Sequence, residues 1–260
     1  MLLERGGAAV VDAHTFVSAT AADLPVEQEA DRALLGVKSR RLAQWLIKQR
    51  AILPQFMERF DSLSEAERKA FHRRTAAAVR LVKGLRIALV GLPNAGKSTL
   101  ANRLIGHDRI LTSPEPGTTR DWVTEIAVIR GWPVTLTDTA GLRQTACPIE
   151  TEAIRRAAHQ AGSADLVLHI VDAAGDEAHH ADALAAAVRD VPVGVPRIMV
   201  LNKCDLPFDS PSEPDLGRAV RVSALTGAGI DELEQAVERL LSLDLLDEEL
   251  PTGFLERHLA

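Results

Sequence analysis

Residues 91–99 read GLPNAGKST, and their types and spacing suit the binding of a phosphate chain. Gly91 and Gly96 let the backbone curl so that successive N–H groups point inward, at the start of an expected helix whose dipole favours an anion. Lys97 adds a positive charge for the β- and γ-phosphate oxygens, and the Ser98 hydroxyl suits Mg²⁺. The nucleotide contacts predicted from this loop are Asn94, Ala95, Gly96, Lys97, Ser98 and Thr99.

A second set of residues predicts how Mg²⁺ and the last phosphate are held. Asp138 ends the apolar run VTLTD and is expected to hold Mg²⁺ through a water, while the Gly141 N–H reaches the γ-phosphate. Thr119, within SPEPGTTRD, is the candidate second hydroxyl ligand. The expected Mg²⁺ set is Ser98, Thr119 and Asp138.

The tetrapeptide NKCD, residues 202–205, predicts guanine rather than adenine. The Asp205 carboxylate can accept hydrogen bonds from guanine N1–H and its exocyclic amine, whereas adenine offers neither donor there. The aliphatic stem of Lys203 can lie along the base, and the Ala224 N–H is expected to meet guanine O6. The predicted base-binding residues are Asn202, Lys203, Asp205, Ser223, Ala224 and Leu225.

One position raises a question about hydrolysis. Leu142 follows the DTAG of residues 138–141, where Ras-type enzymes carry a Gln that orients the attacking water. An isobutyl group cannot orient water, so GTP hydrolysis would need another residue for this step.

The elements that must position these residues follow a recognisable alternation. Short apolar runs alternate with helical patterns around 97–106, 150–162, 178–190 and 229–243. This order predicts an α/β fold with a doubly wound, mostly parallel sheet. One antiparallel hairpin is expected where DWVTEIAVIR meets VTLTD through GWP.

The residues before this alternation read as a smaller all-helical region. Apolar spacing from Val26 to Arg50 predicts one amphipathic helix, and Ser64 with Glu67 predicts a capping box for a second helix that stops at Gly84. We therefore divide the chain into a helical region at 1–84, loosely ordered over 1–24, a nucleotide-binding domain at 85–246 and a tail at 247–260.

Composition and charge limit the remaining classes. No stretch is apolar enough for a membrane span, so we expect a cytoplasmic protein without membrane contact. Cys147 and Cys204 lack the companions that a disulfide framework or zinc site needs. Residues 1–86 hold 15 Lys and Arg against 10 Asp and Glu. This basic region either contacts RNA or docks on the acidic remainder of the chain, and both readings stay open.

The motifs PNAGKSTL, PGTTRD and DTAGLR, with NKCD and SAL in order, resemble the Era/Der/TrmE group of GTPases. The closest resemblance is to the MnmE (TrmE) tRNA-modification family. That resemblance implies K⁺ as an activating cation, pairing of two G domains, and a water-orienting Glu at Glu150. The K⁺ ligands implied are Asn94, Ser113, Glu115 and Thr118. With Lys97 and Gly141, whose contacts to the phosphates are predicted above, Glu150 completes the expected catalytic set.

The chain also departs from that family. We expect it to lack the folate-binding N-terminal domain and the C-terminal Cys-x-Gly-Lys segment. The leading prediction is a GTPase that converts GTP to GDP and switches segments 107–121 and 139–152. A ribosome-assembly GTPase, or a scaffold that senses GTP and GDP without hydrolysis, remain as alternatives.

Overall fold

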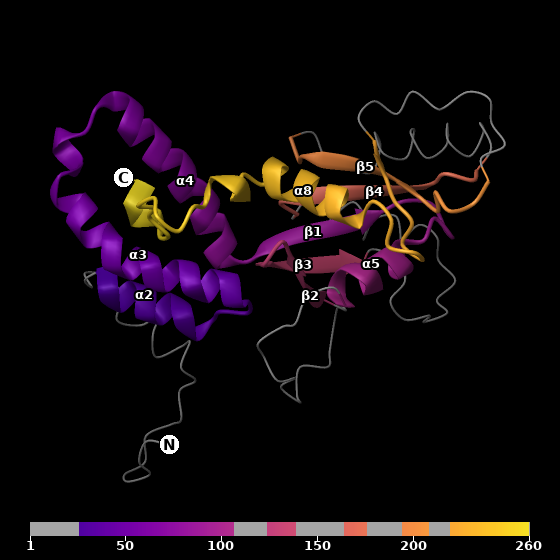
Figure 1. Cartoon of the computed structure of the whole chain (residues 1–260), viewed down its shortest axis with the longest axis horizontal. Coiled ribbons are helices and arrows are strands. Elements are labelled where there is room, and N and C mark those ends of the chain that lie inside the picture. The colour runs from indigo at the N-terminus through magenta and orange to yellow at the C-terminus, as the bar shows by residue number, and fades with distance from the viewer. Residues whose placement is uncertain (1–25, 107–123, 139–163, 176–193, 208–218, 260) are drawn as a thin grey trace, which may run out of the picture.

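The computed structural model describes residues 26–106, 124–138, 164–175, 194–207 and 219–259 (Figure 1). The helices of residues 26–83 form one end of the molecule, and a twisted sheet with two further helices forms the other. Within the described residues, no helix has the length and apolar character to cross a bilayer. Six predicted site residues, together with the expected helices at 150–162 and 178–190, lie outside the described residues. The six are Ser113, Glu115, Thr118, Thr119, Gly141 and Glu150.

The first helical stretch is two helices, α2 (Val26–Leu35) and α3 (Arg40–Glu58), so the single helix predicted from Val26 to Arg50 is wrong. The chain turns after α2, and the Ser39 side chain then accepts a hydrogen bond from the Leu42 N–H at 3.3 Å. A side chain that satisfies an amide of the first turn favours a new helix start. The apolar spacing continued across this break and concealed it.

Helix α4 (Glu65–Lys83) begins as predicted, after the short 3₁₀ turn η1 (Phe60–Ser62). Ser64 Oγ accepts from the Glu67 N–H at 3.3 Å, and Glu67 Oε2 accepts from the Ser64 N–H at 2.9 Å. These bonds complete the capping box. The hydrogen bonds from the Ser64 side chain and backbone lower the pKa of the Glu67 carboxyl below its ordinary value. The helix ends at Gly84, whose φ is 98°.

The sheet confirms the predicted topology, with strand order β2-β3-β1-β4-β5-β6. Strands β2 and β3 form the expected antiparallel hairpin, and the other neighbours are parallel. Their bounds are β1 (Leu85–Val90), β2 (Thr124–Ile129), β3 (Trp132–Asp138), β4 (Leu166–Asp172), β5 (Arg197–Asn202) and β6 (Val220–Arg221). Parallel strands bring their carboxyl ends to one edge, where a ligand site of an α/β sheet is expected.

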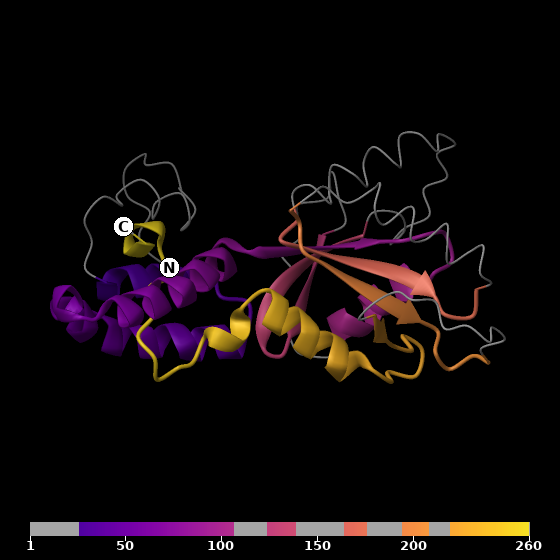
Figure 2. The ribbon, with the colours of Figure 1, turned by 90° about the horizontal axis from the view of Figure 1, so that it is seen from above.

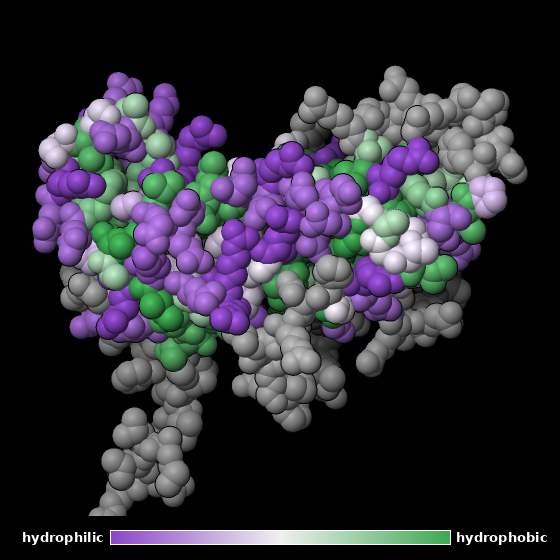
Figure 3. Space-filling model, in the orientation of Figure 1, coloured by the Kyte–Doolittle hydropathy of each residue, from purple (hydrophilic) through white to green (hydrophobic). Residues whose placement is uncertain are grey.

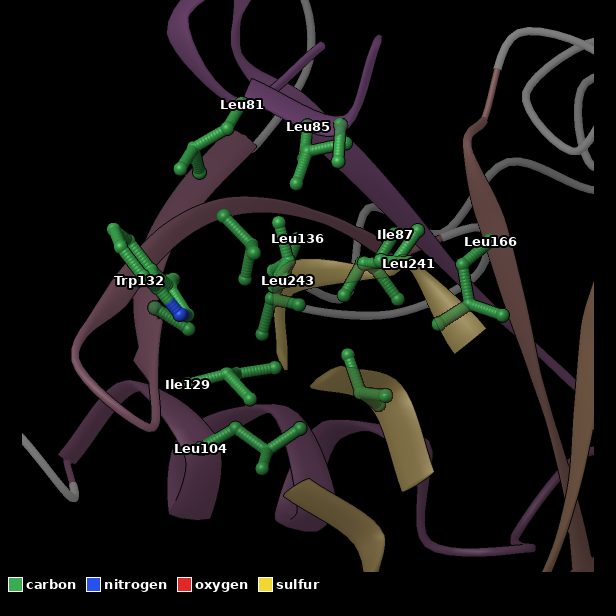
Figure 4. Close-up of a cluster of buried hydrophobic side chains, with 14 of the residues drawn as sticks. Leu81, Leu85, Ile87, Leu104, Ile129, Trp132, Leu136, Leu166, Leu241 and Leu243 are labelled. Carbon is green, nitrogen blue, oxygen red and sulfur yellow. The ribbon is translucent and has the colours of Figure 1, made fainter. Parts of the chain in front are cut away.

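Helices α5 (Lys97–Gly106) and α8 (Ile230–Leu240) lie together on one side of the sheet (Figure 2). Buried side chains from both helices join those of the sheet in one cluster, which Figure 4 shows around Leu104, Ile129 and Leu136. The outward side of α8 is hydrophilic (Figure 3). Its alternation of buried and exposed residues is that of a helix with one apolar face.

The helices and the sheet share the same core. The Trp45 ring of α3 meets the Trp132 ring of β3 edge to face, with centroids 6.4 Å apart, and meets Phe254 in the same way at 6.5 Å. Both tryptophans are fully buried. Such aromatic pairs contribute about 0.5–1.5 kcal/mol beyond the area they bury. The helical end is therefore packed onto the hairpin.

The last residues turn back onto the helices through η2 (Leu243–Leu245) and η3 (Glu256–Leu259) (Figure 1). The Thr252 N–H donates to Gln49 Oε1 at 2.9 Å, and the Gly253 N–H donates to Thr75 Oγ1 at 3.1 Å. The segment expected as a tail thus has buried backbone hydrogen bonds to α3 and α4.

Candidate functional site

The phosphate loop runs between β1 and α5 and is held close to two neighbouring strands. Gly91 has φ 148°, and a Cβ there would lie 2.2 Å from the Ile170 carbonyl oxygen of β4. Gly96 has φ 91°, and a Cβ there would lie 2.1 Å from Asn202 Nδ2. At both positions the backbone has a positive φ, which residues with a side chain disfavour, and a neighbouring atom leaves no room for a Cβ. The two glycines of the motif are therefore required by geometry.

Lys97 and Ser98 open helix α5 directly after this loop. The Lys97 side chain is 8% exposed, and its ammonium donates to the carbonyl oxygens of Gly91 at 2.9 Å and Leu92 at 2.8 Å. Ser98 is half-buried in the first turn. A buried ammonium beside a helix N-terminus concentrates positive potential on the loop, so the loop suits an anion.

Asn202, at the end of β5, bridges the phosphate loop to the loop after β6. Its side chain is 1% exposed. Asn202 Nδ2 donates to the Ala95 carbonyl oxygen at 2.9 Å, and Asn202 Oδ1 accepts from the Ala224 N–H at 3.0 Å. One amide side chain thus satisfies a buried backbone group in each of two loops that lie far apart in the sequence.

Lys203 and Asp205 follow on an exposed turn. Lys203 has φ 66°, and its ammonium lies 2.6 Å from Asp172 Oδ2 at the end of β4. The sequence prediction omitted Asp172, whose place next to Asn202 is given only by the sheet register of the folded chain. This ion pair fixes the direction of the Lys203 stem. The Asp205 carboxylate is exposed, so it is accessible to a ligand.

The Ser223–Leu225 segment is a tight turn with its own hydrogen bonds. Ser223 Oγ accepts from the Thr226 N–H at 3.1 Å. The Ala224 N–H, predicted to meet guanine O6, donates to Asn202 Oδ1 in this structure. Arg103 of α5 also binds this turn, and no motif in the sequence pointed to it.

Asp138 ends β3, where it pairs in register with Leu89 of the neighbouring β1. Its backbone therefore lies at the same edge of the sheet as the phosphate loop. Ser98 carries a hydroxyl oxygen of the kind that Mg²⁺ accepts as a ligand, so this residue fits that ion. Asn94 is exposed and Thr99 lies on α5 beside Arg103. The structure thus gathers the described members of the predicted site at one edge.

Gly96 offers a test of this geometry. Gly96→Ala should reduce GDP affinity at least about 10-fold and lower the free energy of unfolding by more than about 1 kcal/mol, because a side chain is strained at positive φ and meets Asn202. Gly106→Ala is the matched control, since a Cβ there has nothing within 4 Å. Titration calorimetry and urea unfolding measure both quantities; a Gly96→Ala variant that binds GDP like the wild type would contradict this loop geometry.

Comparison with known proteins also indicates a GTPase domain. Residues 86–203 match a family model described as "50S ribosome-binding GTPase". The tRNA modification GTPase MnmE of Methylorubrum populi is 46% identical over 61% of this chain and 33% of that protein. The MnmE of Xylella fastidiosa is 38% identical over 85% of this chain and 52% of that protein.

The chain spans about one third to one half of the length of these relatives. Among solved structures, a GTP-binding protein from Sulfolobus solfataricus in complex with GDP is 18% identical, with a TM-score of 0.44 over 83% of this chain and 71% of that chain. The motifs, the sheet and the identity to MnmE proteins agree. The chain thus carries a P-loop GTPase domain that is similar to that of the MnmE/TrmE proteins.

Proposed function

We propose that this chain binds GTP selectively and hydrolyses it to GDP, using the residues predicted from its motifs. The observation that carries this proposal is the Asn202 side chain, which joins the phosphate loop at Ala95 to the predicted base-binding turn at Ala224. A purine nucleotide must contact both segments at once. A rigid connection between them supports recognition of base and phosphates together.

We propose that Ser98, Asp138 and Thr119 hold Mg²⁺. The ion would neutralise charge on the β- and γ-phosphate oxygens when bound. Lys97 and the first amides of α5 bind the same phosphates. Because Lys97 is already buried against the loop carbonyls, its charge costs little further desolvation when it turns to the ligand.

For the step that Leu142 cannot perform, we propose Glu150 as the residue that orients water. K⁺ would assist by offsetting charge on the phosphates, as an arginine does in other GTPases. Its proposed ligands are Asn94 and Thr118 with the carbonyls of Ser113 and Glu115. Asn94 fits such a role, because it is exposed on the phosphate loop with φ 64°.

Single-turnover hydrolysis tests the catalytic assignment. Glu150→Ala should lower the rate at least about 100-fold while GDP affinity stays within about 2-fold, because the carboxylate acts on water and not on binding. Wild-type turnover should be faster in KCl than in NaCl at equal ionic strength, with ATP as the inactive control.

A Glu150→Ala variant that hydrolyses GTP at the wild-type rate would refute the assignment. Slow, cation-independent rates despite tight GTP binding would favour the sensing scaffold.

Light scattering of the GTP-bound chain in KCl against NaCl tests the proposed pairing of G domains. A mass that stays that of one chain in both salts would refute it.

We also propose that the helical region of residues 1–84 acts as an arm that carries the nucleotide state to RNA, with 85–246 as the GTPase domain. Switching of 107–121 and 139–152 would drive this arm. A link to tRNA modification is proposed from the MnmE relatives, whose names state that role. The exposed Lys69 and Arg73 lie one helical turn apart on α4 and so can both face a phosphate backbone.

Charge reversal tests the RNA proposal. Lys69→Glu with Arg73→Glu should weaken tRNA binding and reduce the salt slope of log affinity by roughly 1–2. Arg239→Glu is the matched control, since this exposed residue lies on α8 and its side chain donates to the Gln235 carbonyl oxygen of its own helix. Filter binding over a salt series measures both; equal affinity of the double variant and the wild type would rule out this surface.

A further inference from the structure

Arg103 connects helix α5 to the predicted base-binding turn. Arg103 Nε donates to the Ala224 carbonyl oxygen at 3.0 Å, and Arg103 Nη2 donates to the Leu225 carbonyl oxygen. Arg103 lies in the last turn of the helix that begins with Lys97. The helix that opens at the phosphate site thus holds the turn with its far end.

These two bonds fix the orientation of the turn's peptide groups. In a trans peptide the C=O and the N–H of the next residue point in opposite directions. Because Arg103 holds the Ala224 C=O toward α5, the Leu225 N–H points away from α5. Arg103 likewise holds the Leu225 C=O, and the Thr226 N–H of that peptide donates to Ser223 Oγ.

The remaining amides of the turn are already engaged. The N–H groups of Ser223, Ala224 and Thr226–Ala228 all donate within the turn or to Asn202. Among the described residues, nothing accepts from the Leu225 N–H, and the Leu225 residue is 71% exposed. The Leu225 N–H is therefore the one amide of residues 223–228 that remains available to a ligand. The exposed Asp205 turn is joined to the start of this segment, because the Cys204 N–H donates to the Val222 carbonyl oxygen at 3.1 Å.

We propose that Arg103 is a positioning residue for guanine recognition: it aims the Leu225 N–H at the O6 acceptor of the bound base. This inference rests on the proposed binding of guanine nucleotides. It assigns O6 to Leu225 in place of Ala224, whose N–H is held by Asn202. Arg103 itself touches the turn and not the ligand, so its effect is on selectivity for one atom of the base.

Nucleotide analogues separate this role from a general structural one. 6-Thio-GDP replaces O6 with sulfur, a weaker acceptor, and IDP lacks the exocyclic amine that Asp205 is predicted to bind. Arg103→Ala should weaken GDP binding about 10-fold and shrink the preference for GDP over 6-thio-GDP. The preference for GDP over IDP should stay unchanged. Arg103→Lys, with one point charge in place of a fork, should give an intermediate result.

Asn102→Ala is the matched control, because Asn102 lines the same surface pocket of α5 and the turn and should leave both preferences unchanged. Calorimetric titration of the three diphosphates, with thermal melting as the folding control, decides the outcome. Equal losses for GDP and 6-thio-GDP in both Arg103 variants would overturn the inference alone. A folded wild-type chain that does not bind GDP would overturn the proposed function and this inference together.

Discussion

The site depends on one buried amide, the side chain of Asn202. It donates a hydrogen bond to the Ala95 carbonyl oxygen in the phosphate loop and accepts one from the Ala224 N–H in the turn after β6. Leaving a buried donor or acceptor unpaired costs about 1–3 kcal/mol, so loss of this side chain would strain both loops together. Asn202 also occupies the space beside Gly96, which explains why the loop has no side chain there. The phosphate loop and the predicted base-binding turn are thus parts of one hydrogen-bonded unit.

The helical end is tied to this unit through the β2–β3 hairpin. Trp132 packs on Trp45, and Arg41 of α3 donates to the Arg130 carbonyl oxygen at the hairpin turn. Glu238 of α8 accepts from both Arg41 at 3.0 Å and Arg130 at 2.8 Å. Strand β3 in this hairpin ends at Asp138, one of the proposed Mg²⁺ residues. The strand that ends at Asp138 is thus packed against α3 through Trp132 and Trp45.

The sequence predicted features that depend on local or repeated patterns. The capping box at Ser64, the hairpin at Gly131 and the parallel sheet each follow from residue types within a short window. It did not predict the break before Ser39, because the apolar spacing continues through it. Arg103 and Asp172 were also missed, since their partners lie 121 and 31 residues away and only the folded chain brings them together.

The account's central claim is that Asn202 couples the phosphate loop to guanine recognition. Equilibrium titration of GDP and ADP against the wild type and Asn202→Ala tests it most directly. We expect the wild type to prefer GDP strongly, and the variant to lose at least about 10-fold in GDP affinity together with part of its preference over ADP. A folded Asn202→Ala chain with wild-type GDP affinity and selectivity would contradict the claim.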